Sequence, residues 1–420
     1  MSQILDIIGS IKGQCDCSIY HDTAIEDIVI ESGAVKRVGE ILSKNNFPKS
    51  LLVVCDKNTI KAADGIEKSL VGFNLEYKIY DFLRVATMEH VQELEALICD
   101  KDIAVLSVGT GSVNDPCRLA CARQNKKLCI FATAPSMDGF ASYGSPIVAN
   151  GFKESFAAKS PEVIIGDTKI LAAAPNELKS AGFGDMIAKY VALIDWKISN
   201  LLTDEIYCEK VAALTRDAVD ELFSMADRVT KNDEETAGKI FEALLKTGIG
   251  MSFMQNSRPA SGSEHIISHL LECKELEHGI IPNLHGDDVG VCTLEMLKLY
   301  NEIAEYEDID TYNEQVNWQE IFDFYGKLKD DVKRLNFPEN IIDSVSPQKL
   351  KENFGKIKEI IKSVPSYEEC KAAMQKAGCK ITVSDIGKDQ KLFEDCTKYS
   401  PYMRKRLTLL RMSTMFSPRN

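Results

Sequence analysis

Four short runs rich in Val, Ile and Leu lie in the first 167 residues, and they constrain the fold more than any other feature. They are SLLVVCD (50–56), IAVLSVG (103–109), LCIFAT (128–133) and EVIIGD (162–167). Continuous apolar runs separated by helical patterns are typical of parallel strands that helices cover on both faces. We therefore expect an α/β N-terminal domain with a parallel, Rossmann-like sheet.

The pattern changes after about residue 168, where long helical stretches such as DMIAKYVALIDWKISNLL replace the strand-like runs. The sequence predicts a boundary between residues 160 and 170, with an α/β domain over 1–165 and an all-α domain over 166–420. Residues 304–363, rich in Asp, Glu and Lys, are expected to form solvated helices. The basic stretch YMRKRLTLLRM (402–412) is expected to form a surface or packing helix rather than a membrane anchor.

Charge and composition exclude several classes of protein. The formal net charge of −13 disfavours nucleic-acid partners, which require a basic face. No stretch approaches the roughly 20 apolar residues of a membrane span, and the N-terminus lacks the features of a secretory signal. The 13 cysteines form no repeated CxxC pairs, so we expect reduced thiols in a cytoplasmic protein rather than a structural zinc cluster.

A glycine-containing loop, GTGSVNDP (109–116), joins two of the predicted strands through a helix. We expect Asp115 to cap that helix and Pro116 to occupy its first position. Gly109 and Gly111 would let the backbone approach a phosphate at the helix start, where free N–H groups attract anions. The third glycine of the dinucleotide fingerprint is absent, and many ordinary strand-to-helix turns contain GxG, so both interpretations remain open.

Asp56 ends the strand-like run SLLVVCD. A carboxylate at this place can accept hydrogen bonds from an adenosine ribose and would disfavour a 2′-phosphate. It can equally be the cap of the next helix.

Four of the six histidines fall within residues 265–285, which is unusual in a histidine-poor chain. His265 and His269 share one helical face, and His285 stands at the expected start of another helix. Two neutral imidazoles and a carboxylate, for which Asp185 in SAGFGDMIAKY is the candidate, would form a catalytic metal site with an open position. The alternatives are a helix cap for Asp185 and core or surface histidines.

Several motifs together resemble the sn-glycerol-1-phosphate dehydrogenases. They are SVGTGSVND, TAPSMDGFAS, SPEVIIGD, AGFGDMIAKYVALIDW, SRPASGSEHIISHLLE and LHGDDVGV, in that order over residues 25–300. This family belongs to the metal-dependent superfamily of iron-containing alcohol dehydrogenases, glycerol dehydrogenases and 3-dehydroquinate synthases. The resemblance implies a dehydroquinate synthase-like fold with an active site in the interdomain cleft. It also implies NAD(P)H-dependent reduction of dihydroxyacetone phosphate to sn-glycerol 1-phosphate for glycerophospholipid synthesis, in a homodimer or larger homo-oligomer.

The resemblance also assigns residues to roles. One divalent metal, zinc or nickel, would be held by Asp185, His265 and His285, and it would polarise the C2 carbonyl of the substrate. Asp138, Asp185 and His269 would contact the substrate, and His269, with an ordinary pKa, would take part in proton transfer. The cofactor would contact Asp56 and, by motif, Gly111, Ser112, Val113, Asn114, Asp115, Thr133, Ala134, Pro135, Ser136 and Ser142.

Arg258 is a further candidate that the resemblance does not supply: it would clamp the substrate phosphate or else form a surface salt bridge. Asp56 favours NAD, whereas Lys57 and Asn58 would accommodate NADP. Many superfamily members carry a histidine where this chain has Ile281, and His278 receives no role. Three alternative functions remain: a polyol dehydrogenase without a phosphate requirement, a dehydroquinate synthase-like cyclase, and a catalytically silent scaffold. In the cyclase motif a lysine follows the position of Asp185 by three residues, whereas in this chain Lys189 follows it by four.

Overall fold

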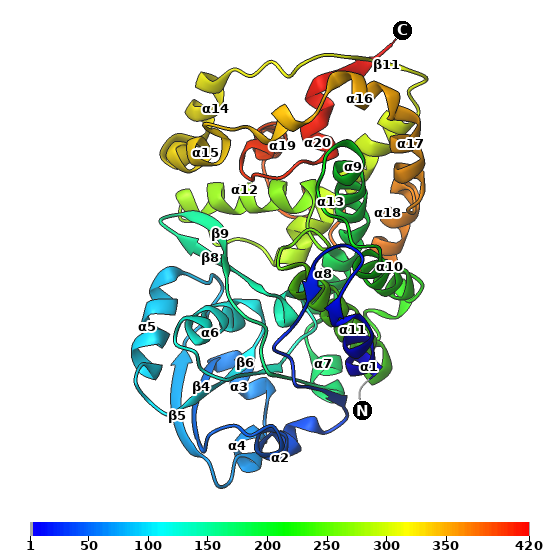
Figure 1. Cartoon of the computed structure of the whole chain (residues 1–420). Helices are drawn as coiled ribbons and strands as arrows, with labels where there is room; N and C mark the ends of the chain where they lie inside the picture. The colour runs from blue at the N-terminus through cyan, green and yellow to red at the C-terminus, as the bar shows by residue number, and fades with distance from the viewer. Residues whose placement is uncertain (1–2, 420) are drawn as a thin grey trace.

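The computed structural model describes residues 3–419, and a six-stranded parallel sheet forms the centre of its first half (Figure 1). All neighbouring strands of this sheet pair in parallel. In spatial order they are β3 (Asp27–Glu31), β10 (Val163–Asp167), β7 (Leu128–Ala132), β6 (Ala104–Gly109), β4 (Ser50–Asp56) and β5 (Asn74–Tyr80). The four predicted strands are therefore confirmed. The two edge strands β3 and β5 were not expected from the sequence. For β5 the reason is that half-buried and exposed residues mix along it, so it forms no apolar run.

Helices cover both faces of this sheet, as the apolar runs predicted. Leu51 and Val53 of β4 pack in one core cluster, while Leu52 and Val54 pack in another, because successive side chains of a strand point to opposite faces. The helices of this half are α1 (Gln3–Ile11), α2 (Val38–Lys44), α3 (Lys57–Ala62), α4 (Ile66–Ser69), α5 (Met88–Ile98), α6 (Gly111–Arg123) and α7 (Thr168–Ala173). Two antiparallel hairpins accompany them: β1 (Gly13–Gln14) with β2 (Tyr20–His21), and β8 (Gly144–Ala149) with β9 (Phe152–Ala157).

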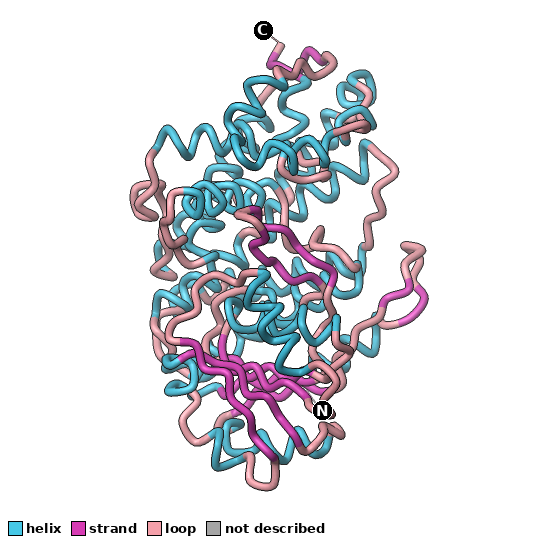
Figure 2. The backbone as a smooth tube through the Cα atoms, turned by 90° about the vertical axis from the view of Figure 1, so that its left-hand side faces the viewer, coloured by secondary structure: helices cyan, strands magenta, loops and turns pink. Residues whose placement is uncertain are grey.

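Helices fill the second half of the molecule, apart from a small sheet of β11 (Ile309–Thr311) and β12 (Phe416–Pro418) (Figure 2). They are α8 (Asn176–Ile187), α9 (Lys189–Leu202), α10 (Glu209–Phe223), α11 (Glu234–Met254), α12 (Ser263–Glu277), α13 (His285–Ala304), α14 (Trp318–Tyr325), α15 (Lys329–Asn336), α16 (Pro347–Glu352), α17 (Phe354–Lys362), α18 (Tyr367–Lys376), α19 (Gln390–Tyr399) and α20 (Leu409–Met412). Short 3-10 helices are η1 (Ala34–Arg37), η2 (Asp138–Ala141), η3 (Ala226–Arg228), η4 (Gly326–Leu328), η5 (Ile341–Ser344), η6 (Ser400–Tyr402) and η7 (Ser413–Met415). Phe241 and Leu245 of α11 share a core cluster with sheet residues, so the division at residue 165 stays a prediction.

The C-terminal stretch 402–412 differs from its expectation. Only its last residues are α-helical, in α20, and most of its apolar side chains are buried. Arg411 is fully buried and pairs with Glu314, so this arginine lies inside the fold rather than on a surface helix. Residues 304–363 do form helices, and their apolar faces, such as Leu350 and Ile357, pack in the core of this half. Among the described residues, no helix is long and apolar enough to cross a bilayer.

Candidate active site

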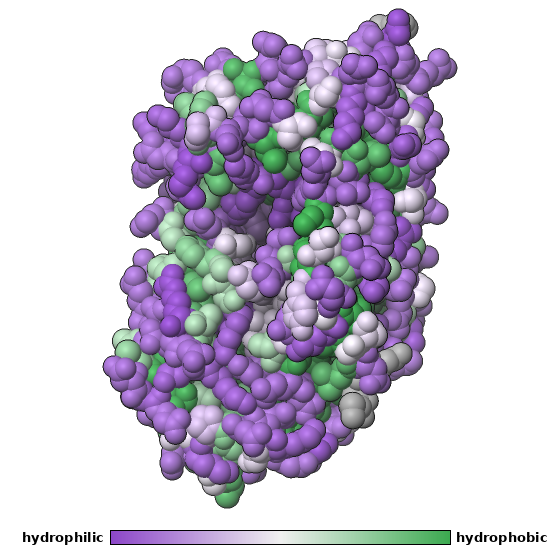
Figure 3. Space-filling model, in the orientation of Figure 1, coloured by the Kyte–Doolittle hydropathy of each residue, from purple (hydrophilic) through white to green (hydrophobic). Residues whose placement is uncertain are grey.

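A cavity of about 1110 Å³ lies between the carboxyl edge of the sheet and the helical half. Its opening is the hollow at mid-height in Figure 3, where hydrophilic residues gather. Asp56, Thr110 and Thr133, which end or follow β4, β6 and β7, line one side, whereas His265 and His285 line the other. Crevices outside the carboxyl ends of parallel strands are the usual ligand sites of open α/β sheets.

Glycines bring the elements of the cavity wall together. A Cβ on Gly182 of α8 would lie 2.0 Å from the carbonyl oxygen of Pro135, and one on Gly286 would lie 1.8 Å from that of Ala181. Any larger residue would therefore separate α8 from the 133–138 loop or from α13. The glycines in the AGFGD and LHGDD motifs thus allow the backbone contacts that place Asp185 beside the first turn of α13.

Asp185 lies inside α8 rather than at a helix start, and its carboxylate is fully buried. The backbone N–H of Asp138 donates to its Oδ2 at 2.9 Å, and the Lys189 ammonium donates to its Oδ1 at 2.8 Å. Burial alone would raise the pKa of Asp185, but the charge of Lys189 and the hydrogen bond with His265 hold it well below its ordinary value. Asp185 is therefore an ionised carboxylate at neutral pH.

Lys189 also pairs with Asp138, at 2.6 Å, so one buried ammonium lies between two buried carboxylates. Although burial lowers the pKa of Lys189, the two carboxylates raise it above its ordinary value. Burial and the neighbouring Asp185 raise the pKa of Asp138. From the sequence, the spacing of Lys189 served only as an argument against a cyclase function. Its i, i+4 spacing from Asp185 is the signal that would have indicated this ion pair.

His265 and His285 face Asp185 from two helices. The Nε2 atom of His265 lies 3.4 Å from Asp185 Oδ1, while its Nδ1 atom hydrogen-bonds the buried Glu264 carboxylate at 2.6 Å. His285 is the first residue of α13, and its Nδ1 atom is buried without a hydrogen-bond partner among the described residues. Sequence reasoning missed Glu264, whose position directly before His265 gives no periodic signal.

These three side chains fit a divalent metal. One ligand atom from each of Asp185, His265 and His285 lies within 4.8 Å of the other two. A carboxylate that fixes the tautomer of a ligating imidazole, as Glu264 does for His265, is the usual support of such a ligand. The Nδ1 atom of His285, buried and without a hydrogen-bond partner among the described residues, is an atom that a bound ion could satisfy. That these residues hold a metal stays a prediction, which this convergence supports.

His269 lies one turn after His265, with its ring 5.6 Å from that of His285. Its Nδ1 atom lies 3.5 Å from the Arg404 guanidinium. Burial, together with the nearby cations Lys153 and Arg404, lowers the pKa of His269 well below its ordinary value. The expected ordinary pKa is therefore wrong: His269 is a neutral imidazole, which can donate or accept a hydrogen bond but does not carry a stored proton.

The glycine loop differs from its expectation at the helix start. The helix α6 begins at Gly111, with Thr110 as its N-cap, so Asp115 is not the cap and Pro116 lies inside the helix. Asp115 is instead buried against Arg118, and burial raises the pKa of its carboxyl to about 6. Thr110, Gly111 and Ser112 line the cavity, so the first turn of α6 still presents backbone to it.

The remaining predicted cofactor residues divide into two groups. Asp56 lines the cavity, and its Oδ1 also accepts from the backbone N–H groups of Asn58 and Thr59, so the helix-cap alternative is confirmed. The predicted cofactor residues Asp115, Ala134, Ser136 and Ser142 also line the cavity, and so does Asp138, which was predicted to contact the substrate. Three of the predicted cofactor residues do not line the cavity. They are Val113 and Asn114, whose backbone N–H groups donate to the Thr110 carbonyl, and Pro135, which contacts Gly182.

Arg258 is not in the cavity, which corrects the expected phosphate clamp. Its guanidinium is buried and engaged by Glu205, and it also donates to the Leu407 carbonyl at 2.6 Å. Arg406 lines the cavity instead. Its donors bind the Ser261 carbonyl at 2.6 Å and the Ser257 hydroxyl at 2.6 Å, so it is held beside the residues that precede α12. His278 is exposed at the end of α12 and lies outside the cavity.

Comparisons with known proteins agree with this geometry. Residues 29–175 match the iron-containing alcohol dehydrogenase family. The chain is 30% identical to an NAD(P)+ glycerol-1-phosphate dehydrogenase of Geobacillus thermodenitrificans, over 98% of this chain and 97% of the relative. It is 32% identical to that of Methanosarcina mazei, over 75% and 82%. An iron-containing alcohol dehydrogenase structure from Corynebacterium glutamicum, 13% identical, superimposes with a TM-score of 0.63 over 96% of this chain and 98% of the other.

Proposed function

Because the chain belongs to the glycerol-1-phosphate dehydrogenase family, we propose that it catalyses the reversible NAD(P)H-dependent reduction of dihydroxyacetone phosphate to sn-glycerol 1-phosphate. The observation that carries this proposal is the convergence of Asp185, His265 and His285 at a cavity that also meets the start of α6. A hydride transfer needs a nicotinamide and an electrophilic group within one enclosed space, and the proposed metal ligands and the start of α6 line one cavity, which supports the proposal.

In the proposed enzyme, Asp185, His265 and His285 hold one divalent ion, and this donor set suits either zinc or nickel. When bound, such an ion polarises the substrate carbonyl and stabilises the negative charge that develops on its oxygen. Lys189 keeps Asp185 ionised, and Glu264 directs the lone pair of His265 Nε2 toward the ligand site. These two residues act through the ligands and are positioning residues.

The proposed cofactor site is the edge of the sheet. The first turn of α6 presents Gly111 and Ser112 to the cavity, where backbone N–H groups and the helix dipole favour a diphosphate. Asp56 lies at the end of the neighbouring strand β4, where its Oδ2 can accept from a ribose hydroxyl while Oδ1 caps α3. Lys57 is engaged by Asp81, at 2.6 Å, so a 2′-phosphate would compete with that carboxylate. We therefore propose NADH as the preferred cofactor.

Arg406 is the residue that we propose for the substrate phosphate. It forms no ion pair within the described part of the chain, whereas Lys153, another cation of the cavity, pairs with Glu272 at 2.5 Å. Burial and the neighbouring Arg258 lower the pKa of Arg406 to about 9, because the cavity does not compensate its charge. A phosphate dianion would supply that compensation and would accept the guanidinium donors as a fork.

His269 is proposed to donate a hydrogen bond from its Nε2–H to a substrate hydroxyl or to the developing alkoxide. Its Nδ1 atom faces Arg404, a donor, which favours the tautomer with the proton on Nε2. Since its pKa is lowered, His269 is a neutral hydrogen-bond donor that orients this oxygen, and the proton that the alkoxide needs comes from solvent.

The test compares NADH and NADPH oxidation with dihydroxyacetone phosphate, dihydroxyacetone and glyceraldehyde 3-phosphate, before and after chelation. We expect dihydroxyacetone phosphate to be reduced fastest, activity to disappear on chelation, and zinc or nickel to restore it. Equal rates with and without the phosphate would instead indicate the polyol dehydrogenase alternative. Chiral analysis of the product tests the stereochemistry.

A further inference from the structure

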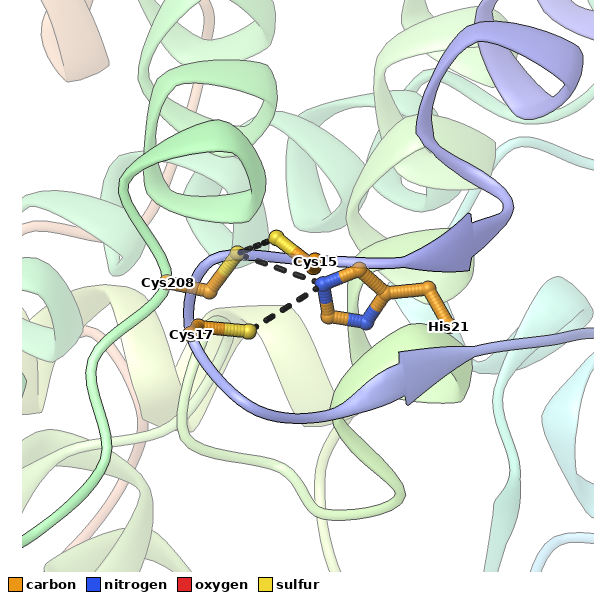
Figure 4. Close-up of side chains that lie close together, drawn as sticks. All are labelled: Cys15, Cys17, His21 and Cys208. Carbon is orange, nitrogen blue, oxygen red and sulfur yellow. Dashed lines mark hydrogen bonds between the residues drawn. The ribbon is translucent and has the colours of Figure 1, made fainter.

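A second cluster of metal-ligating side chains lies outside the cavity, between the N-terminal hairpin and the start of α10. Cys15 and Cys17 stand in the turn between β1 and β2, His21 ends β2, and Cys208 is the N-cap residue of α10 (Figure 4). Their ligand atoms all lie within 4.8 Å of one another. None of the four lines the cavity, so the proposed enzyme does not use them.

The distances match the edges of a tetrahedron around one ion. Cys15 Sγ lies 3.8 Å from Cys208 Sγ, and the Nε2 atom of His21 lies 3.4 Å from Cys17 Sγ and 3.3 Å from Cys208 Sγ. A tetrahedral zinc ion with Zn–S bonds of about 2.3 Å and a Zn–N bond of about 2.0 Å separates two sulfurs by about 3.8 Å. It separates a sulfur from a nitrogen by about 3.5 Å. These three separations thus agree with a tetrahedral zinc site, and the other three are within 4.8 Å.

His21 is oriented as a metal ligand. Its side chain is fully buried, and its Nδ1 atom hydrogen-bonds the Phe253 carbonyl at 3.0 Å. A carbonyl only accepts, so this bond places the ring proton on Nδ1 and leaves the Nε2 lone pair pointing toward the three sulfurs. A backbone carbonyl on the second nitrogen is the usual support of a zinc-bound imidazole.

The cysteines are also held in place. Ser18 adopts a left-handed backbone conformation, φ 69°, and its N–H donates to the Cys15 carbonyl at 3.0 Å, so the turn folds back over the site. The residues before Cys208 are fixed by Trp196, whose indole N–H donates to Ile206 at 2.9 Å.

We propose that Cys15, Cys17, His21 and Cys208 form a closed structural site for one zinc ion. Three thiolates and one imidazole, all supplied by the protein, leave no open position for a substrate, which is the mark of structural rather than catalytic zinc. The ion ties the N-terminal hairpin to the start of α10 and, through His21, to the end of α11. Such a cluster was disfavoured from the sequence because the cysteines form no repeated CxxC pairs. The separation of 187 residues between His21 and Cys208 leaves no local signal of their contact.

The test measures metal content rather than activity, so its result does not depend on the proposed reaction. The protein is produced with zinc in the medium and purified without chelators or added thiols, and its zinc is measured by mass spectrometry. We expect the His265→Ala variant, which lacks a ligand of the other site, to retain about one zinc per chain. Adding Cys208→Ser should remove that ion, whereas adding Cys99→Ser, at an exposed cysteine, should not.

Cobalt substitution of the unaltered chain covers the case in which a variant does not fold. Three thiolates should give an intense thiolate-to-cobalt charge-transfer absorption, which a site of Asp185, His265 and His285 cannot produce. Absence of that band, less than a stoichiometric ion in His265→Ala, or a Cys15–Cys208 disulfide in the freshly purified protein would each overturn the proposal.

Discussion

Replacement of Arg406 by glutamine should weaken the use of dihydroxyacetone phosphate far more than that of dihydroxyacetone. The guanidinium is half-buried, lines the cavity and forms no ion pair in the described part of the chain. Glutamine keeps a polar side chain, but its amide ends near the position of Arg406 Nε, so it removes the charge, the planar fork and the bonds to Ser257 and Ser261.

The magnitude follows from the bonds that the phosphate would lose. A hydrogen bond to a charged group contributes about 1.5–3 kcal/mol, and a guanidinium fork offers two such bonds to a phosphate. Since paired contributions are not fully additive, we expect a loss of about 3–4 kcal/mol of transition-state stabilisation. At about 1.4 kcal/mol per factor of ten, kcat/KM for dihydroxyacetone phosphate should fall roughly 100- to 1000-fold.

Steady-state NADH oxidation with both substrates measures this loss, and dihydroxyacetone serves as the internal control because it lacks the phosphate. Arg406→Lys, which keeps the charge without the fork, should show an intermediate loss. Arg334→Gln, which removes one positive charge at an exposed position, should leave both rates unchanged. If the two substrates lose activity equally in Arg406→Gln, the residue only positions the chain around Ser257 and Ser261, and the phosphate argument is refuted.

Three further predictions test the surroundings of the site. Glu264→Gln should weaken metal binding by about 10- to 100-fold in a competition titration with a chelator, and an unchanged affinity would contradict its orienting role. Gly286→Ala should destabilise the fold by about 1–3 kcal/mol in urea unfolding, because its Cβ would lie 1.8 Å from the Ala181 carbonyl oxygen; a neutral effect would show that α13 can shift. Burial opposes ionisation of Asp27, but the Lys44 ammonium holds the pKa of the Asp27 carboxyl below its ordinary value of 3.8. The ion pair therefore stabilises the fold above pH 3.8, and this contribution is lost as the pH falls through the pKa of the folded state. Asp27→Asn should therefore flatten the acid limb of the unfolding free energy, and an unaltered limb would exclude this ion pair as its source.

The sheet could be predicted from the sequence because each buried strand is a local signal. Its four central strands are continuous apolar runs, and they appear where those runs stand. The edge strand β5 could not be predicted in this way, since the sequence NLEYKIY mixes polar and apolar residues as its half-exposed position requires. The start of α6 was placed too late because Asp115 and Pro116 carry ordinary helix-start signals, whereas Thr110 caps the helix without a side-chain hydrogen bond.

The convergence of Asp185, His265 and His285 could be anticipated, because motif and helical spacing both indicate it. Which of Arg258 and Arg406 lines the cavity could not be anticipated from the sequence. Both are arginines near the same helix, and only the fold reveals that Glu205 neutralises Arg258 while the chain returns from residue 400 to place Arg406 in the cavity. Long-range pairings of this kind leave no periodic trace in a sequence.

In this fold, the arginine proposed to bind the substrate phosphate lies on a different segment from the proposed metal ligands. Arg404 and Arg406 belong to a segment that is anchored at both ends. Arg404 donates to the Lys153 carbonyl of β9 at 2.7 Å, and the backbone N–H of Leu409 donates to Asp195 of α9 at 2.8 Å. Arg258 supports this segment by donating to the Leu407 carbonyl. Arg258 thus positions Arg406, although it does not line the cavity itself. Changes within residues 404–407 should therefore alter which anion the cavity accepts without moving the helices that carry the proposed metal ligands.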